Sequence, residues 1–486
     1  VLALISQRNK HGRARRCCAA LHHNDLNRRR HGQKNAGGIE KGGEPLFSNH
    51  DLKAMILPLF FEQLLVMLVG LADTLVVSYA GEAAVSGVSL VNQFNTIFIY
   101  LFTALASGGA VVISQYIGRQ ERNRAGEAAT QLLTASVLFS IVISIVVLLT
   151  NASLMRLMFG RVEDDVMDAC VTYLRISAYS YPALAIYNAG AALYRSFGKT
   201  STTMYLSITA NVINVIGNCI GVFLLRAGVA GVAWPSLISR AFSAAVITIL
   251  CFSRKNPVRY IKEWLFRLDG ELQKRILRIA VPNGVESGIF QLVKVALSSV
   301  VALFGTYQIA ANGVAQSIWS MASLVSVAMG PVFITVIGQC MGAGAIEQAE
   351  LYFKKLMKIT LVFAIIWNVL IFAATPVLLS FYALAEETKR LTILLVLIHN
   401  IFSAIAFPFA DPLGKGLRAA GDVRFTTAVS LFTTIGVRLV FSVLFGITLN
   451  MGVMGIVWAM CLDWSIRGII FILRQQSGKW KAFQVI

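Results

Sequence analysis

Two acidic residues stand out within one long apolar stretch, residues 54–79. Glu62 and Asp73 are 11 positions apart. On an α-helix this spacing corresponds to about 1100° of rotation, so both side chains project from one face, about 16 Å apart along the axis. Two carboxylates that line a water-filled interior would form a path for cations or protons. The alternative interpretation is that a hydrogen-bonding neighbour neutralises each of them and that they only shape packing.

Three asparagines form a row in a second apolar stretch, TANVINVIGN. Asn211, Asn214 and Asn218 follow one another at spacings of three and four, which places them on one helical face. Asparagine in a helical bundle often serves simple interhelical hydrogen bonding. Because this row would accompany a helix with two acids, we interpret it as the lining of a polar cavity.

The second half of the chain carries a different set of polar residues. Its counterpart of the asparagine row is Thr433, Thr434 and Arg438, and its other charged candidates for a cavity lining are Glu286, Lys294 and Asp411. Acids and bases there can neutralise one another, and we favour this interpretation for Arg438. Asp463 and Arg467 are spaced i and i+4, which indicates an ion pair within one helix.

Composition excludes most classes of protein. The 486 residues are 56% apolar and 14% charged, with a mean hydropathy of +0.69, unlike a water-soluble domain. The net charge of +19 lies in short segments between apolar runs, which indicates the anionic face of a membrane rather than nucleic acid. Five of the six histidines precede residue 51, so no histidine metal site is expected in the body. No nucleotide-binding loop or hydrolase motif is present, and no catalytic residue is assigned.

Twelve apolar runs are long enough to span a membrane as helices. They are 54–79, 88–114, 129–150, 168–193, 202–225, 230–252, 279–304, 312–338, 357–382, 391–413, 425–447 and 452–473. The predicted fold class is therefore an all-α polytopic membrane protein with 12 transmembrane helices.

The chain also repeats itself, and corresponding residue numbers differ by 224. This offset relates Pro58 to Pro282, Glu62 to Glu286, Gln115 to Gln339 and Gly228 to Gly452, and a slip of one relates Arg195 to Arg418. The repeat predicts two pseudo-symmetric lobes of six helices in the same orientation. The predicted divisions are a basic N-terminal tail (1–52), a first lobe (53–253), a linker (254–278) that is partly an amphipathic helix, a second lobe (279–474) and a C-terminal tail (475–486).

The basic residues predict the orientation. If both termini are cytoplasmic, the inside segments hold 33 of the 43 Lys and Arg residues, and the outside loops hold five. Basic residues concentrate on the cytoplasmic side of membrane proteins. We therefore expect a multi-pass protein of the plasma (inner) membrane, with both tails and the linker in the cytoplasm.

Several motifs resemble the multidrug and toxic compound extrusion (MATE) family over residues 50–486. They are ILPLFFEQLLVMLVGLADTLVVSYAGEAAVSGVSLVN from residue 56, ISQYIGR from 113, GVAWPS from 231 and GLRAAGD from 416. The resemblance implies a two-lobed exporter that expels organic, often cationic, compounds in exchange for Na⁺ or H⁺. It implies that Asp73 binds the cation, with Asn214, Asn218 and Ser236 beside it.

The second lobe departs from the family pattern. One branch carries carboxylates in helices 7 and 10, where this chain has Phe290 and Phe407, and Glu286 and Asp411 lie one turn away. This departure shifts the expected coupling site to Asp73, the one position where a bound Na⁺ is expected.

The sequence thus predicts a secondary antiporter that works by alternating access, as a monomer, on small organic substrates. Its partners are those substrates and membrane lipid, with no nucleic acid and no cofactor beyond the coupling H⁺ or Na⁺. The alternative is a flippase for a lipid-linked oligosaccharide from the same superfamily, which would need a strongly cationic cavity. A third possibility, a polytopic membrane enzyme, is disfavoured because His399 is the one histidine in the body.

Overall fold

The computed structural model describes residues 45–486, except 161, 266, 383 and 484. Phe47–Ile486 forms one compact unit, and its described residues include helices and turns but no strand. The predicted tail lies mostly outside the described residues. Its end does not: the first helix begins at Asn49, inside the segment predicted as tail, and the Ser48 hydroxyl caps it by accepting from the Asp51 amide.

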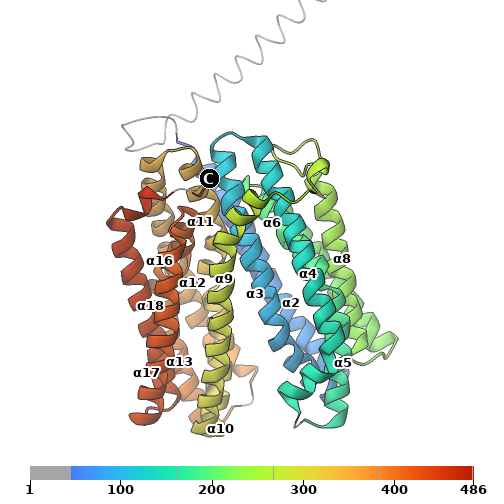
Figure 1. Cartoon of the computed structure of the whole chain (residues 1–486). Helices are drawn as coiled ribbons and strands as arrows, with labels where there is room; N and C mark the ends of the chain where they lie inside the picture. Colours follow the sequence, from blue (N-terminus) through green and yellow to red (C-terminus); the bar gives the residue numbers. More distant parts are fainter. Residues whose placement is uncertain (1–44, 161, 266, 383, 484) are drawn as a thin grey trace, which may run out of the picture. The chain divides into compact units, whose positions relative to one another are not determined.

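The first half of the unit contains the helices α2 (Asn49–Ser78), α3 (Glu82–Gly118), α4 (Arg122–Phe159), α5 (Asp164–Tyr179), α6 (Tyr181–Ser196), α7 (Thr200–Cys219) and α8 (Ala230–Cys251). The second half contains α9 (Gly270–Val301), α10 (Thr306–Ala322), α11 (Leu324–Gly342), α12 (Ile346–Ser380), α13 (Glu386–Ile405), α14 (Phe407–Ala410), α15 (Pro412–Ala419), α16 (Val423–Phe432), α17 (Val440–Val443) and α18 (Val453–Gln476). Figure 1 shows the helices of each half gathered into a lobe.

Eleven helices of the described chain are long and apolar enough to cross a membrane. Two of the predicted spans are represented only in part by these helices: 312–338 is divided into α10 and α11 at Ser323, and 391–413 runs from α13 into the short helices α14 and α15. The remaining predicted span, 168–193, is divided into α5 and α6 at Ser180. Pro182 causes this break, because proline has no N–H to donate to the carbonyl four residues earlier and clashes with it. That carbonyl, on Ala178, instead accepts from the Ser144 hydroxyl at 2.9 Å.

The backbone repeats with the same period as the sequence. Positive φ angles occur at pairs of positions whose numbers differ by 224: Gly81 (106°) and Gly305 (90°), Gln120 (64°) and Gly344 (69°), Arg226 (48°) and Asn450 (54°), Gly228 (54°) and Gly452 (59°). The π-helical segments η1 (Ile220–Leu224) and η5 (Leu444–Thr448) are related by the same offset. The two lobes therefore share one backbone design.

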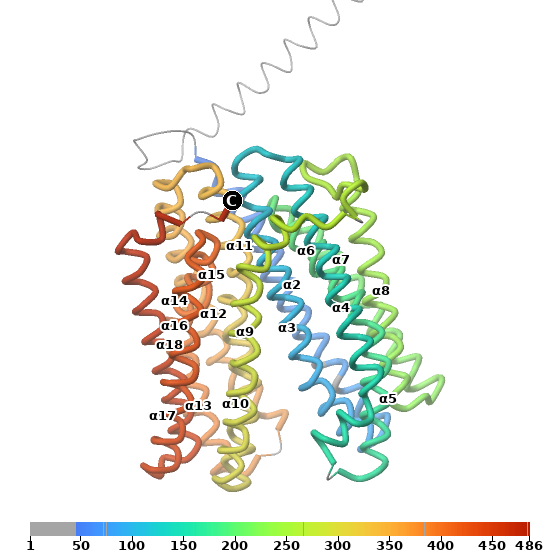
Figure 2. The backbone as a smooth tube through the Cα atoms, viewed as in Figure 1, coloured from blue at the N-terminus to red at the C-terminus, as the bar shows by residue number. Residues whose placement is uncertain are grey.

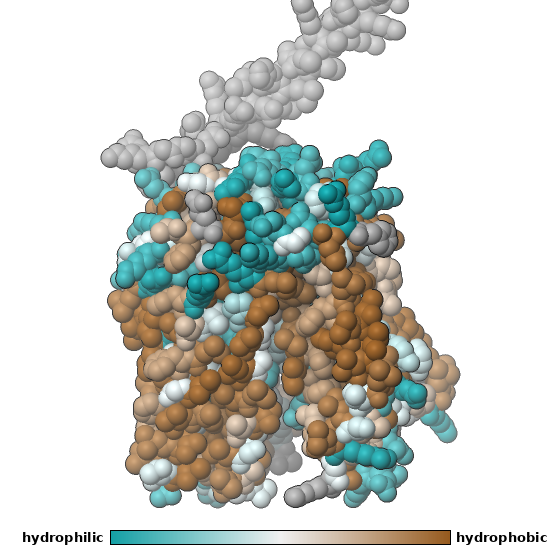
Figure 3. All heavy atoms as spheres, viewed as in Figure 1, coloured by the Kyte–Doolittle hydropathy of each residue, from teal (hydrophilic) through white to brown (hydrophobic). Residues whose placement is uncertain are grey.

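The lobes meet at one end and separate at the other. Between them, α3 packs against α9 and α11, and α2 packs against α11. Figure 2 shows the two groups of helices converging at the end that carries the C-terminus and diverging toward the opposite end. In Figure 3 hydrophilic side chains gather at the converging end, and the surface is hollowed between the lobes at the other. We call the converging end the basic end, because the exposed Arg119, Arg122, Arg254 and Arg259 lie in its loops and helix termini.

The linker is helical only in part: α9 covers its last residues, 270–278, and no separate α-helix precedes them among the described residues. Its described residues before Gly270 contain one short 3-10 helix, η2 (Lys262–Trp264), and otherwise irregular chain. It is attached to α4 by side chains of that helix: Thr130 accepts from the Ile261 amide at 2.9 Å, and Gln131 accepts from the Asp269 amide at 3.2 Å. Asp269 then caps α9, which starts within the predicted linker.

The C-terminal segment, predicted as a tail, packs onto the second lobe. The short helix η6 (Lys479–Ala482) places Trp480 in a fully buried position against the ring of Phe353. Lys481 forms an ion pair of 2.6 Å with Glu350 of α12. The described residues of 475–486 are therefore part of the folded unit.

Candidate functional site

Asp73 lies on α2 and faces α7 inside the first lobe. Its Oδ1 accepts a hydrogen bond of 2.8 Å from Nδ2 of Asn218, which is fully buried. Asp73 itself is partly exposed. The helices α2 and α7 are direct neighbours, so the predicted meeting of the acid and the asparagine row is present in the structure.

Asn214 and Ser236 complete this group. With its amide nitrogen toward the carboxylate, Asn214 donates to Oδ1 and Oδ2 of Asp73 at 3.0 and 3.1 Å, and its oxygen accepts from the Ser236 hydroxyl at 2.9 Å. This orientation satisfies both ends, because a carboxylate accepts hydrogen bonds and an amide nitrogen donates them. Residues from α2, α7 and α8 therefore surround one carboxylate with neutral polar groups.

A cavity of about 220 Å³ opens beside Asp73. Asn211, Asn214 and Ser236 line it, together with Arg240 of α8. An adjoining cavity of about 450 Å³, between α2, α3 and α5, shares Asp73 and Ser236 with the first. Asp73, Asn214, Ser236 and Asn211 thus lie around hollow space within the lobe, whereas the buried Asn218 lines neither cavity and contacts Asp73 from behind.

Glu62 lies elsewhere, in a buried ion pair. Its Oε1 is 2.7 Å from Nη2 of Arg195, and its Oε2 accepts from the Thr203 hydroxyl at 3.1 Å. The carboxylate is 3% exposed and lines neither cavity beside Asp73. For Glu62 the structure therefore matches the alternative interpretation, a carboxylate neutralised by its neighbours.

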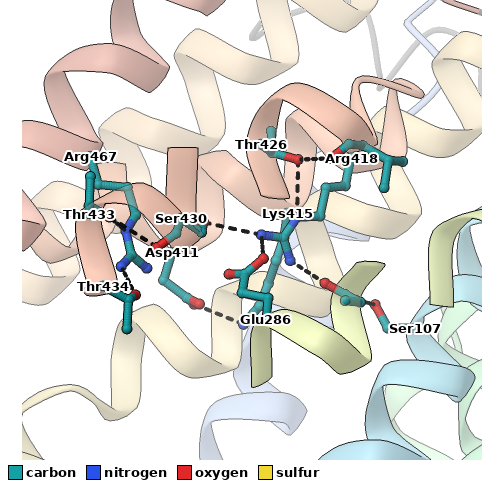
Figure 4. A network of polar contacts seen from close by, with 12 residues as sticks. Ser107, Glu286, Asp411, Lys415, Arg418, Thr426, Ser430, Thr433, Thr434 and Arg467 are labelled. Atoms are coloured by element: carbon teal, nitrogen blue, oxygen red, sulfur yellow. Dashed lines mark hydrogen bonds and ion pairs between the residues drawn. The ribbon is translucent and has the colours of Figure 1, made fainter. Parts of the chain in front are cut away.

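The second lobe repeats this ion pair. Glu286 pairs with Arg418, the two residues that the repeat relates to Glu62 and Arg195 (Figure 4). Arg418 also donates to Thr426 at 3.2 Å. Asp411, the other acid predicted for this region, pairs with Lys415 one turn along the chain at 2.8 Å.

Two arginines share one carboxylate deeper in the second lobe. Nη2 of Arg467 lies 2.7 Å from Oδ1 of Asp463, and Nε of Arg438 lies 3.4 Å from Oδ2. Arg467 also donates to the Thr433 and Thr434 hydroxyls at 2.9 and 2.8 Å (Figure 4). The predicted pairing of Asp463 with Arg467 and the predicted neutralisation of Arg438 are both present. Lys294, the remaining candidate, is exposed on α9.

One contrast separates Asp73 from the other acids. Glu62, Glu286, Asp411 and Asp463 each form an ion pair with a basic residue. Asp73 forms none with the residues that the structure describes. It is therefore the carboxylate whose charge the protein leaves to be balanced by something else.

Sequence reasoning missed three arginines at these sites. Arg195 and Arg418 were identified only as residues that the repeat relates to each other, and their ion pairs were not predicted. The signal was that the repeat also relates their two partners, Glu62 and Glu286. Arg240 was overlooked, although an isolated arginine in the apolar stretch 230–252 is itself a signal, since charge at membrane depth is costly. Among the described residues, no group of three or more His, Cys, Asp and Glu could hold a metal ion.

The comparison with known families follows the repeat. The family model MatE matches the chain twice, at residues 58–220 and 282–444, so the bounds of the second match exceed those of the first by 224. Together these matches cover well over half of the chain. The protein belongs to the MATE family of multidrug efflux transporters, and it is a transporter rather than an enzyme.

Curated relatives resemble the chain over most of its length. An uncharacterized transporter of Bacillus subtilis, YisQ, is 27% identical and covers 91% of this chain and 96% of its own length. A probable multidrug resistance protein NorM of Thermotoga maritima is 22% identical over 90% of this chain and 94% of its own. The mouse multidrug and toxin extrusion protein 2 is 24% identical over 87% of this chain and 74% of its own.

Solved structures share the fold. One, described as the outward-facing conformation of a multidrug resistance MATE family transporter, matches with a TM-score of 0.82 at 20% identity, over 88% of this chain and 95% of its own. A MATE structure in complex with Br-NRF matches with a TM-score of 0.75 at 19% identity over the same shares. The predicted fold, an all-helical polytopic membrane protein of MATE type, is confirmed.

Proposed function

We propose that this protein exports small organic compounds, chiefly amphiphilic cations, in exchange for H⁺ or Na⁺, and that Asp73 binds the coupling ion. The observation that carries the proposal is that Asp73 lines two cavities without an ion-pair partner among the described residues, whereas Glu62, Glu286, Asp411 and Asp463 are each paired. A carboxylate that forms no ion pair with the described residues is free to take up an ion in one conformation and release it in the other.

The neighbours of Asp73 suit this task. The carboxylate and the Ser236 hydroxyl offer oxygen ligands, which hard cations such as Na⁺ prefer. Asn214 and Asn218 turn their amide nitrogens toward Asp73, so each would add its oxygen to a Na⁺ site only after its amide rotates. For a proton the carboxylate alone suffices. In either case coupling requires the ion to bind the two conformations with different affinity, since equal affinity drives nothing.

The direction of transport follows from the basic residues. The positive-inside bias supports an orientation with the basic end in the cytoplasm and with both termini and the linker on that side of the plasma membrane. The hollow between the lobes at the opposite end then opens to the outside (Figure 3). We propose that the transporter works as a monomer, which is supported by the presence of both lobes in one chain.

The alternative of a flippase for a lipid-linked sugar receives less support. It needs a strongly cationic cavity for a pyrophosphate, yet Arg438 and Arg467 both pair with Asp463, and Arg195 and Arg418 each pair with a glutamate. Among the intramembrane basic residues discussed above, only Arg240 and Lys294 lack an ion pair with the described residues, which is a weak positive field for a doubly charged group.

The proposal is tested with purified protein in proteoliposomes that contain a fluorescent organic cation. The expected result is that an imposed gradient of pH or of Na⁺ drives transport of the dye against its own gradient, and the effective gradient identifies the ion. Protein-free vesicles under the same gradients are the control. Transport that follows the dye gradient alone, with no response to either ion, would refute the antiport.

A further inference from the structure

Arg240 places a positive charge inside the first lobe, in the middle of the apolar helix α8. It lies one turn beyond Ser236 and lines the cavity of about 220 Å³ that Asp73 also lines. It forms no ion pair within the described part of the chain. A basic side chain at membrane depth costs about 2.5–3.5 kcal/mol on insertion scales, so such a residue is normally paired or functional.

The break between α5 and α6 holds the guanidinium in place. Nη1 of Arg240 donates to the Ser180 hydroxyl at 2.7 Å, and that hydroxyl donates to the Ser177 carbonyl at 2.6 Å. The hydroxyl proton is therefore committed to the carbonyl, and the oxygen is oriented to accept from Arg240. One of the five guanidinium N–H groups is engaged in this way, and the others remain available for an acceptor in the cavity.

The arginines of the second lobe that have a structural role are paired with a carboxylate of the protein. Arg438 and Arg467 both pair with Asp463, and the repeat relates Arg240 to Trp464, a neutral residue. Arg240 is thus a feature of the first lobe alone. It differs from Arg438 and Arg467 because it lines a cavity and lacks a carboxylate of the protein.

We propose that Arg240 is an anion-binding subsite of the first-lobe cavity, which takes the carboxylate of organic substrates that carry both a cationic group and a carboxylate. Guanidinium and carboxylate match in geometry and can form two parallel hydrogen bonds. The cavity then offers Asp73 to the cationic group of such a zwitterion and Arg240 to its anionic group. This inference rests on the proposed function and names a substrate class for the same site.

The test uses a matched pair of probes: a cationic rhodamine with a free carboxylate and the methyl ester of the same dye. Binding of each to the purified protein in nanodiscs is measured by fluorescence anisotropy at neutral pH, for the wild type, Arg240→Gln and Arg240→Lys. Arg175→Gln is the matched control, because Arg175 is an exposed membrane arginine of α5 that does not line the cavity.

The expected result is selective. Arg240→Gln weakens binding of the acid about tenfold or more, the scale of a lost charge-assisted hydrogen bond, and changes binding of the ester less than twofold. Arg240→Lys recovers part of the affinity for the acid, and Arg175→Gln changes neither. Ester binding in Arg240→Gln also shows that the variant is folded.

Two results would overturn the inference. If Arg240→Gln weakens binding of the acid and of the ester equally, and Arg240→Lys does not selectively restore binding of the acid, Arg240 serves packing or ion coupling instead. Unchanged binding of the acid would exclude the subsite outright. Failure of the proposed function is distinguishable from both, because it would appear as wild-type protein that neither binds nor transports the ester.

Discussion

Gln115 and Gln339 join the two lobes by the same hydrogen bond made twice. Nε2 of Gln115 donates to the carbonyl of Ala419 at 2.8 Å, and Nε2 of Gln339 donates to the carbonyl of Ser196 at 2.7 Å. The repeat relates the two glutamines to each other and, with its slip of one, also relates their two acceptors. Each bond runs from a helix of one lobe to the end of a helix in the other. Together they hold the basic end closed in this conformation.

Removing both glutamines should therefore favour opening at the basic end. Each bond contributes about 1 kcal/mol, so Gln115→Ala with Gln339→Ala should shift the equilibrium roughly 30-fold toward the other conformation. Spin labels at the exposed positions Arg122 and Glu347 would report a longer distance by double electron–electron resonance. Gln476→Ala, at the exposed end of α18, is the control. An unchanged distance distribution in the double variant would show that the glutamines do not stabilise this state.

The ion pair of Glu62 with Arg195 should matter for stability. Glu62→Gln leaves a largely buried guanidinium without its counter-charge, which typically costs about 3–5 kcal/mol, so we expect a loss of about 3 kcal/mol in the free energy of unfolding. Glu286→Gln should behave alike, because its partner Arg418 is 9% exposed. Denaturant titration in detergent micelles measures both variants.

The exposed pair of Glu386 with Arg390 supplies the control for these measurements. Its side chains are 71% and 81% exposed, so Glu386→Gln should change stability by less than about 1 kcal/mol. A Glu62→Gln variant as stable as this control would contradict the assignment of a structural role.

Replacing the asparagines of the first lobe should affect ion coupling, whereas replacing their second-lobe counterparts should affect stability. Asn214→Leu with Asn218→Leu removes hydrogen bonds to Asp73 and should weaken the ion dependence of transport. Thr433→Leu with Thr434→Leu removes acceptors of Arg467 and should lower stability, with coupling retained in the protein that folds. Transport rates at several ion concentrations, beside a melting curve for each variant, separate the two effects. Identical behaviour of the two double variants would refute the asymmetry between the lobes.

The orientation rests on charge and can be measured on intact cells. Single cysteines replace Lys255 in the linker and Glu163 in the loop before α5, in a version without the seven native cysteines. An impermeant thiol reagent should label position 163 and not position 255. Labelling of 255 alone would reverse the orientation and the inferred direction of transport.

The sequence predicted the helices and their repeat because both leave regular patterns, and it predicted the group around Asp73 through the family resemblance. Apolar runs of membrane length and a nearly constant offset specify six helices twice, and the spacing of Asn214 and Asn218 specifies a face. Partners from different helices leave no such pattern: Arg195 reaches Glu62 across 133 positions, and nothing local indicates it. Pro182 could have indicated the break at Ser180, but prolines also occur within the unbroken membrane helices α2 and α9.

The most direct test of the account compares Asp73→Asn with the wild type in the same proteoliposomes, under an imposed ion gradient and in dye exchange without a gradient. We predict that Asp73→Asn abolishes gradient-driven transport, because the neutral amide cannot balance a bound ion, while dye exchange and thermal stability stay near wild type. Gradient-driven transport at the wild-type rate in Asp73→Asn would contradict the central claim that this carboxylate couples ion to substrate.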